Sequence, residues 1–165
     1  MKGSSINLRD LVFVIADPSP YLGMLVHGIL RGFGANKVIE ARVEGAASEA
    51  EARRVAREIV ASLGVKTAVY GHDPNWGRIL AAVGNAGASF DPEKTALYLG
   101  SPDGGELCLY RDGAPLAYDA GAAKACFTPR EVRFRITMGL GDGAATAWGS
   151  DMTEDYVRLN SLYTT

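Results

Sequence analysis

Short apolar segments that alternate like strands fill the chain beyond Gly87, with turn signals between them. Asp112-Gly113 separates two of these segments and is typical of a two-residue hairpin, and the glycine-rich run 139–143 separates two others. The predicted strands are 96–99, 107–110, 115–118, 132–136 and 144–148. Hairpins pair strands antiparallel, so this pattern disfavours a doubly wound parallel sheet.

A long amphipathic helix is predicted before this region. Ser48 and Glu51 have the spacing of a capping box, and Gly64 is expected to end the helix. Between them, apolar residues recur at helical spacing and form a stripe that must be buried, namely Val55, Ala56, Ile59, Val60 and Leu63. Charged residues on the other side are interpreted as a solvated surface: Glu49, Arg53, Arg54 and Arg57.

A second amphipathic helix is predicted to start in the most distinctive block of the chain, residues 65–78, and to end around Gly84. Asp73 can cap this helix and Pro74 fits its first position, while residues 67–70 look like a strand that runs through Gly71 into the helix. Amides at a helix start favour anions, so a substrate carboxylate could dock near residues 71–75. The simpler interpretation is favoured: Asp73 closes its own helix and the apolar side of the helix fills the core.

The remaining predicted elements are short. Strands are predicted over 11–15 and 38–43, and helices over 21–30, 122–127 and 154–159. The chain of 165 residues shows no internal repeat and is long enough to bury a core. We therefore expect an α+β fold: one compact domain with a mixed or antiparallel sheet and two main amphipathic helices.

The charge balance disfavours several classes of partner. Lys and Arg total 17 against 19 Asp and Glu, a formal net charge of −2, which leaves no basic surplus for nucleic acid. No apolar stretch approaches the roughly 20 residues that span a bilayer, and the first residues lack the apolar core of a secretory signal. We expect a soluble cytoplasmic protein that binds neither nucleic acid nor a membrane.

Few residues suggest chemistry of their own. Cys108 and Cys126 lack neighbours at metal-ligand spacing and are expected to be buried thiols, so no metal or cofactor is expected. The run 139–143 is similar to a phosphate-binding loop, but a strand rather than a helix is predicted after it, which favours a hairpin turn.

Of the two histidines, His27 is expected in the interior and His72 is the better catalytic candidate. A hydrolase centred on His72 is an alternative that we disfavour, because adjacent residues such as His72 and Asp73 rarely orient one another and no serine lies on a nucleophile-elbow motif.

Five blocks of sequence together resemble a known enzyme family. They are Val43-Glu-Gly-Ala46, Val65-Lys-Thr67, Gly71-His-Asp-Pro-Asn-Trp-Gly-Arg-Ile79, Ala147-Trp-Gly-Ser-Asp151 and Tyr156-Val-Arg-Leu-Asn160. The family is bifunctional ornithine acetyltransferase, also called glutamate N-acetyltransferase, of arginine biosynthesis. The resemblance runs from about Gly32 to Thr165. It implies that residues 32–165 form the C-terminal domain of the family's β chain and that residues 1–31 are a weakly matched strand–helix segment.

The resemblance implies covalent acyl transfer on a threonine. The family cuts its own precursor before this threonine, which then carries the acetyl group from N-acetylornithine to ornithine or glutamate, while donors from an α segment supply the oxyanion site. Lys2-Gly3-Ser4 is similar to the segment before that threonine, but no threonine follows. We therefore expect no catalytic residue in this chain and no acyltransferase activity from it alone.

Substrate contacts are implied at Asn160 and Thr165, which match the family's asparagine and near-terminal threonine. The alternatives are a polar cap of the last helix for Asn160 and a frayed end for Thr165. Phe33 stands where the family has a substrate-contacting glutamate, which removes an acceptor for the amines of ornithine.

We expect a small amino-acid ligand, namely ornithine, N-acetylornithine or glutamate. We also expect association with an α-chain-like partner or with a second copy, because a domain without its partner exposes apolar surface. The alternative is a non-catalytic binding or assembly module derived from this family, which has changed its ligand.

Overall fold

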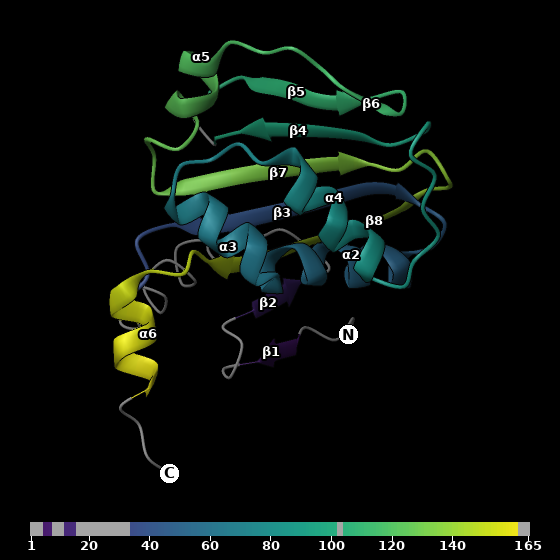
Figure 1. Cartoon of the computed structure of the whole chain (residues 1–165). Helices are drawn as coiled ribbons and strands as arrows, with labels where there is room; N and C mark the ends of the chain where they lie inside the picture. Colours follow the sequence, from purple (N-terminus) through teal and green to yellow (C-terminus); the bar gives the residue numbers. More distant parts are fainter. Residues whose placement is uncertain (1–4, 8–11, 16–33, 102–103, 162–165) are drawn as a thin grey trace.

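The computed structural model describes residues 5–7, 12–15, 34–101 and 104–161, and a single mixed sheet organises them (Figure 1). In this part of the chain the strand order is β1-β2-β8-β3-β7-β4-β5-β6. The strands are β1 Ser5–Asn7, β2 Val12–Ile15, β3 Val38–Ala46, β4 Ala96–Gly100, β5 Glu106–Arg111, β6 Ala114–Pro115, β7 Glu131–Thr137 and β8 Gly143–Ser150. Strands β3 and β7 are parallel and the other pairs are antiparallel, which confirms the predicted α+β fold.

Three helices lie on one face of the sheet (Figure 1): α2 Glu49–Ala61, α3 Leu63–Tyr70 and α4 Trp76–Asn85. Helix α5, Ala120–Ala125, lies at the β5 end of the sheet, and helix α6, Glu154–Ser161, follows β8 beyond the strand ends. Among the described residues, no helix has both the length and the apolar character that crossing a membrane requires.

The core lies between this sheet face and the helices. Alternate residues of β3 and β7 are almost fully buried there, as strand geometry requires: Ile39, Ala41, Val43, Val132, Phe134 and Ile136. The stripe of α2 packs against them with Ala52, Val55, Ala56, Ile59 and Val60, all of them fully buried. The predicted helix and strands are confirmed here.

The predicted start of α2 is confirmed, but its predicted end is wrong. The Ser48 hydroxyl accepts a hydrogen bond from Glu51 N at 3.2 Å, as an N-cap does. The helix then ends at Ala61 rather than at Gly64. Leu63, expected in the buried stripe, is 64% exposed because the chain has already turned.

Residues 67–70, predicted as a strand, belong to helix α3. Ser62 starts this helix by accepting a hydrogen bond from Val65 N. Three apolar residues at helical spacing then face the core, namely Val65, Ala68 and Val69. The β-branched residues of this short segment favoured a strand, but the cap and the packing against the sheet select a helix.

The run 139–143 is not a hairpin turn, because the strands that it joins are not neighbours. Strands β7 and β8 flank β3 on opposite sides, so the connection crosses the end of β3. The amides of Leu140 and Gly141 donate to the Gly45 carbonyl at 2.7 and 3.1 Å. The sequence predicted all three strands, but not that the strand over 38–43 lies between the other two.

The predicted hairpin at Asp112-Gly113 is confirmed, with φ of 53° and 75° at the two residues, as a type I′ turn requires. Its second strand, β6, is shorter than predicted. Strand β2 matches the strand predicted over 11–15. The helix predicted over 21–30 lies outside the described residues, and the division of the chain at residue 31 stays a prediction.

Candidate functional site

The turn between α3 and α4 contains the most distinctive block of the sequence. Gly71 ends α3, and His72 N then donates to Val69 O at 3.1 Å while Asp73 N donates to Ala68 O at 2.9 Å. These two bonds define a Schellman motif. His72 occupies the left-handed position of this motif with a φ of 54°, where glycine is the usual residue.

Asn75, not Asp73, caps helix α4. The Asn75 Oδ1 atom accepts from Arg78 N at 3.1 Å, and its Nδ2 atom donates to Asp73 Oδ2 at 3.0 Å. Pro74 therefore precedes the cap instead of occupying the first helical position. The predicted cap was wrong because Asp73 and Asn75 are both good cap residues, and the turn after α3 selects the later one.

Further contacts tie this block to its surroundings. The Arg78 guanidinium donates to Gly64 O and Thr67 Oγ1, both at 3.3 Å, and so fastens α4 to α3. Trp76 stacks on Tyr110 of β5 with ring centroids 6.0 Å apart. These contacts give the block a structural role in fixing the α3–α4 corner, and anion docking at this corner stays a prediction.

His72 makes an aromatic contact. Its ring stacks on Phe127 with centroids 5.8 Å apart and an interplanar angle of 15°. This contact indicates a packing role, so the structure adds no support to a hydrolase centred on His72. His27 lies outside the described residues.

A second region, at the end of β8, gathers buried polar groups. Asp151 is fully buried, and its Oδ1 atom accepts from Asn36 N at 3.0 Å and from Lys37 N at 3.1 Å. Burial raises the pKa of the Asp151 carboxyl, and the two amides oppose this shift. Its Oδ2 atom and Ser150 Oγ are buried without a hydrogen-bond partner among the described residues.

Two lysines lie in the same region. The Lys37 ammonium donates to the carbonyls of Phe127 and, at 2.8 Å, of Pro129, and burial lowers the pKa of this ammonium although Asp151 opposes the shift. Lys66 is 3% exposed, and its ammonium lies 5.6 Å from the centroid of the Tyr156 ring.

Thr153 joins this region to α6. Its hydroxyl donates to Gly34 O at 2.7 Å and accepts from Tyr156 N at 2.9 Å. Thr153 therefore caps α6 and holds the turn before β3 with one side chain. A groove of about 370 Å³ lies beside it, lined by Tyr70, Met152, Thr153, Glu154, Val157 and Arg158.

Of the residues implied in ligand binding, Asn160 lies within α6. Its side chain, like Thr165 and Phe33, falls outside the described part of the structure, so the binding roles stay predictions. Sequence reasoning missed Thr153, although a threonine followed by two acidic residues is a helix-start signal. It also gave no role to Asp151, which stood in a recognised motif.

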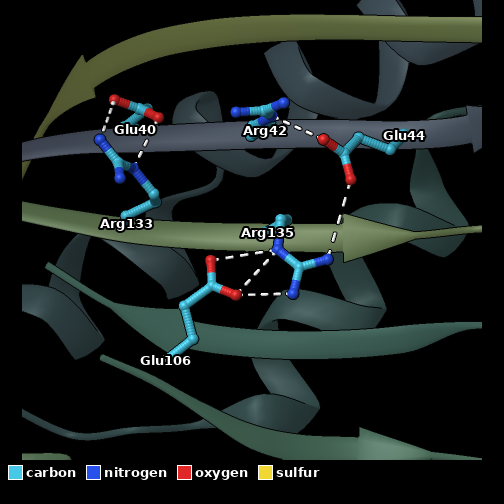
Figure 2. A network of polar contacts seen from close by, with 6 residues as sticks. All are labelled: Glu40, Arg42, Glu44, Glu106, Arg133 and Arg135. Atoms are coloured by element: carbon cyan, nitrogen blue, oxygen red, sulfur yellow. Dashed lines mark hydrogen bonds and ion pairs between the residues drawn. The ribbon is translucent and has the colours of Figure 1, made fainter. Parts of the chain in front are cut away.

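The sheet face opposite α2–α4 carries paired charges (Figure 2). Arg135 of β7 contacts Glu106 of β5 at 2.6 Å and Glu44 of β3 at 3.7 Å. The hydrogen bonds from Arg135 lower the pKa of the Glu106 carboxyl. The Arg135 guanidinium also lies 3.9 Å from the Tyr98 ring centroid. The charged residues of this face are thus paired with one another across neighbouring strands.

The cysteines differ in burial. Cys126 is buried, as predicted, and burial raises the pKa of its thiol, whereas Cys108 is only partly buried. Among the described residues, no group of three or more His, Cys, Asp or Glu side chains could hold a metal ion.

Comparison with known proteins decides the family. The model of the ArgJ family matches residues 22–165. The chain belongs to the ArgJ family. It is 49% identical over 134 residues to the arginine biosynthesis bifunctional protein ArgJ of Parasynechococcus marenigrum. The aligned region covers 81% of this chain and 32% of that protein. It is 50% identical over 135 residues to the ArgJ protein of Thermus thermophilus, and the aligned region covers 81% of this chain and 34% of that protein.

A solved ArgJ structure shares the fold. The crystal structure of the arginine biosynthesis bifunctional protein of Bacillus halodurans is 33% identical, with a TM-score of 0.74, and the match covers 90% of this chain and 74% of that one. The chain thus spans about a third of the length of the curated ArgJ relatives that it matches.

Proposed function

We propose that this chain acts in arginine biosynthesis as the C-terminal part of an ArgJ-type acetyltransferase, and that it contributes an amino-acid-binding surface rather than the attacking nucleophile. The observation that carries the proposal is the family match over residues 22–165, together with relatives about half identical in sequence and named for arginine biosynthesis. The resemblance implies a threonine nucleophile, and Lys2-Gly3-Ser4 is not followed by one.

The geometry at the start of α6 supports this proposal. The resemblance implies a ligand contact at Asn160, which lies in this helix, whereas Phe33, directly before Gly34, replaces the family's glutamate. The hydrogen bond from Thr153 to Gly34 O joins the two segments at 2.7 Å. This bond holds the start of the helix that carries Asn160, and a fixed backbone favours ligand binding.

The proposed ligands are ornithine, N-acetylornithine and glutamate. An asparagine amide both donates and accepts hydrogen bonds, so Asn160 suits an α-amino or an α-carboxylate group of any of the three. Phe33, at the family's glutamate position, provides apolar surface and no acceptor, so the side-chain amine of ornithine loses one partner there.

A transfer assay tests the proposal that the nucleophile lies outside these residues. The purified 165-residue polypeptide is incubated with N-acetylornithine and glutamate, and N-acetylglutamate is measured alongside the intact mass of the protein. We expect no turnover above the protein-free control and no stable acetyl adduct. Turnover, or an acetyl group on any side chain, would contradict the proposal.

We also propose that the chain associates with a partner chain or with a second copy. Five large apolar side chains are exposed among the described residues, and two of them, Tyr70 at 39% and Val157 at 51%, line the groove beside α6. Light scattering of the purified chain should give a mass above that of one copy, or a mass that rises when a family α segment is added. A single-copy mass under both conditions would contradict the proposal.

A further inference from the structure

The Thr153 side chain makes two hydrogen bonds. Its hydroxyl is 2.7 Å from Gly34 O, to which it donates, and 2.9 Å from Tyr156 N, from which it accepts. The residue is 4% exposed, so water competes little for either contact. A hydroxyl is the smallest group with both a donor and acceptors, and both are used here.

The backbone of the turn packs directly on α6. A Cβ atom at Gly34 would lie 2.9 Å from both Asp155 C and Tyr156 N, closer than real Cβ atoms come, and the φ of 80° is one that glycine adopts readily. No side chain therefore separates the turn from the first turn of the helix. Displacement of either segment must displace the other.

Asp151 fixes the other end of the same turn. Its Oδ1 atom accepts from the amides of Asn36 and Lys37, and its own amide donates to Lys37 O at 3.2 Å. Residues 34–37 are thus attached to residues 151–156 at both ends. We call this set of contacts the turn–helix latch.

Helix α6 needs tertiary contacts for its order. It has eight residues, and helices this short are unstable in water without tertiary contacts. Beyond the first turn, Val157 and Arg158 are exposed. Position 160 follows Tyr156 by four residues, so the two positions share one side of the helix.

We propose that Thr153 is a positioning residue, which couples the turn 34–37 to α6 and so holds in place the helix that carries the ligand contact at position 160. This rests on the proposed function, because the ligand contact at Asn160 is implied by the family. Preorganisation of this kind lowers the cost of ordering the site when ligand binds.

The test compares three variants by hydrogen–deuterium exchange and by calorimetry with ornithine, N-acetylornithine and glutamate. Thr153→Val keeps the branched shape and removes both hydrogen bonds, whereas Thr153→Ser keeps the hydroxyl. Thr95→Val is the matched control, because Thr95 is 1% exposed and its hydroxyl donates to Asp91 O at 2.7 Å, away from α6.

We expect Thr153→Val to bind the amino acid that the unsubstituted chain binds about tenfold more weakly, as two lost hydrogen bonds imply. Exchange should become faster in residues 34–37 and 154–161 together. Thr153→Ser should stay close to the unsubstituted chain in both measurements, and Thr95→Val should change neither.

Two results overturn the positioning role and leave the proposed function intact. One is an unchanged affinity of Thr153→Val for the amino acid that the unsubstituted chain binds, and the other is faster exchange in α6 without faster exchange in residues 34–37. A general loss of stability would instead weaken binding equally in Thr95→Val and Thr153→Val, which also contradicts the proposal. If the unsubstituted chain binds none of the three amino acids, the proposed function fails and the positioning role fails with it.

Discussion

Arg133 on β7 holds the carboxylate of Glu40 on β3 by two hydrogen bonds, from Nε to Oε1 at 2.8 Å and from Nη2 to Oε2 at 3.2 Å (Figure 2). The two residues lie directly opposite each other in the parallel pair. Glu40 is 8% exposed, and burial raises the pKa of its carboxyl despite the guanidinium. Glu40 is therefore a buried charge with one main partner.

Arg133→Met should destabilise the chain by about 2 kcal/mol at pH 7, because it leaves the Glu40 carboxylate buried without its donor. At pH 4 the loss should be smaller, because burial raises the pKa of the Glu40 carboxyl and so favours its neutral form as the pH falls. Urea unfolding at both pH values measures it. The double variant with Glu40→Gln should recover part of the stability, and equal losses in the single and double variants would contradict this account.

Glu106 should make the chain sensitive to acid. Arg135 lowers the pKa of Glu106 in the folded state, so this group adds stability above its unfolded pKa and loses it as the pH falls through the folded value. Glu106→Gln should therefore flatten the fall in unfolding free energy between about pH 5 and pH 3. Urea titrations at several pH values measure this, and an unchanged slope would be the opposing result.

The cap of α4 can be tested with two alanine variants. Asn75→Ala should lower the free energy of unfolding by about 1 kcal/mol, because the Asn75 side chain accepts a hydrogen bond from Arg78 N at 3.1 Å. Asp73→Ala should cost less, since Asp73 only accepts from the Asn75 side chain. Thermal and urea unfolding of the two variants decide between Asn75 and Asp73 as the cap. A larger loss of stability for Asp73→Ala would favour the cap predicted from the sequence.

Two glycine-to-alanine substitutions should change the free energy of unfolding in opposite directions. A Cβ at Gly149 of β8 would lie 2.9 Å from Val60 Cβ and 3.0 Å from Val60 O on α2, so Gly149→Ala should cost about 1–3 kcal/mol. A Cβ at Gly84 of α4 meets no atom of the described chain within 4 Å, and Gly84→Ala should stabilise by up to about 1 kcal/mol. Chemical unfolding measures both, and destabilisation by Gly84→Ala would argue against this packing.

Elements with a clear periodic pattern could be predicted from the sequence. Helix α2 has a cap at Ser48 and a stripe of apolar residues, and β7 alternates buried Val132, Phe134 and Ile136 with charged residues. Each pattern has the periodicity of a helix or of a strand but not of both, so the local sequence decides the structure. Helix α3 has eight residues with a β-branched composition, which fits either period, and its contact with the sheet decided between them.

The candidate site was less predictable because its contacts are long-range. Asp151 and Asn36 lie 115 positions apart, and Thr153 and Gly34 lie 119 apart. No local pattern links such residues, and the order of β7, β3 and β8 in the sheet brings them together. The resemblance to a family pointed to Asn160, whereas the buried contacts that hold its helix emerged only from the structure.

Calorimetric titration with ornithine, N-acetylornithine and glutamate tests the central claim most directly. We expect at least one of them to bind saturably to the 165-residue chain, and Asn160→Ala to weaken that binding about tenfold or more. Ser161→Ala, in the same helix, is the control and should leave binding unchanged, because the Ser161 hydroxyl donates to Arg158 O and is exposed. Absence of binding by all three amino acids, or equal binding by the Asn160→Ala variant, would contradict the account.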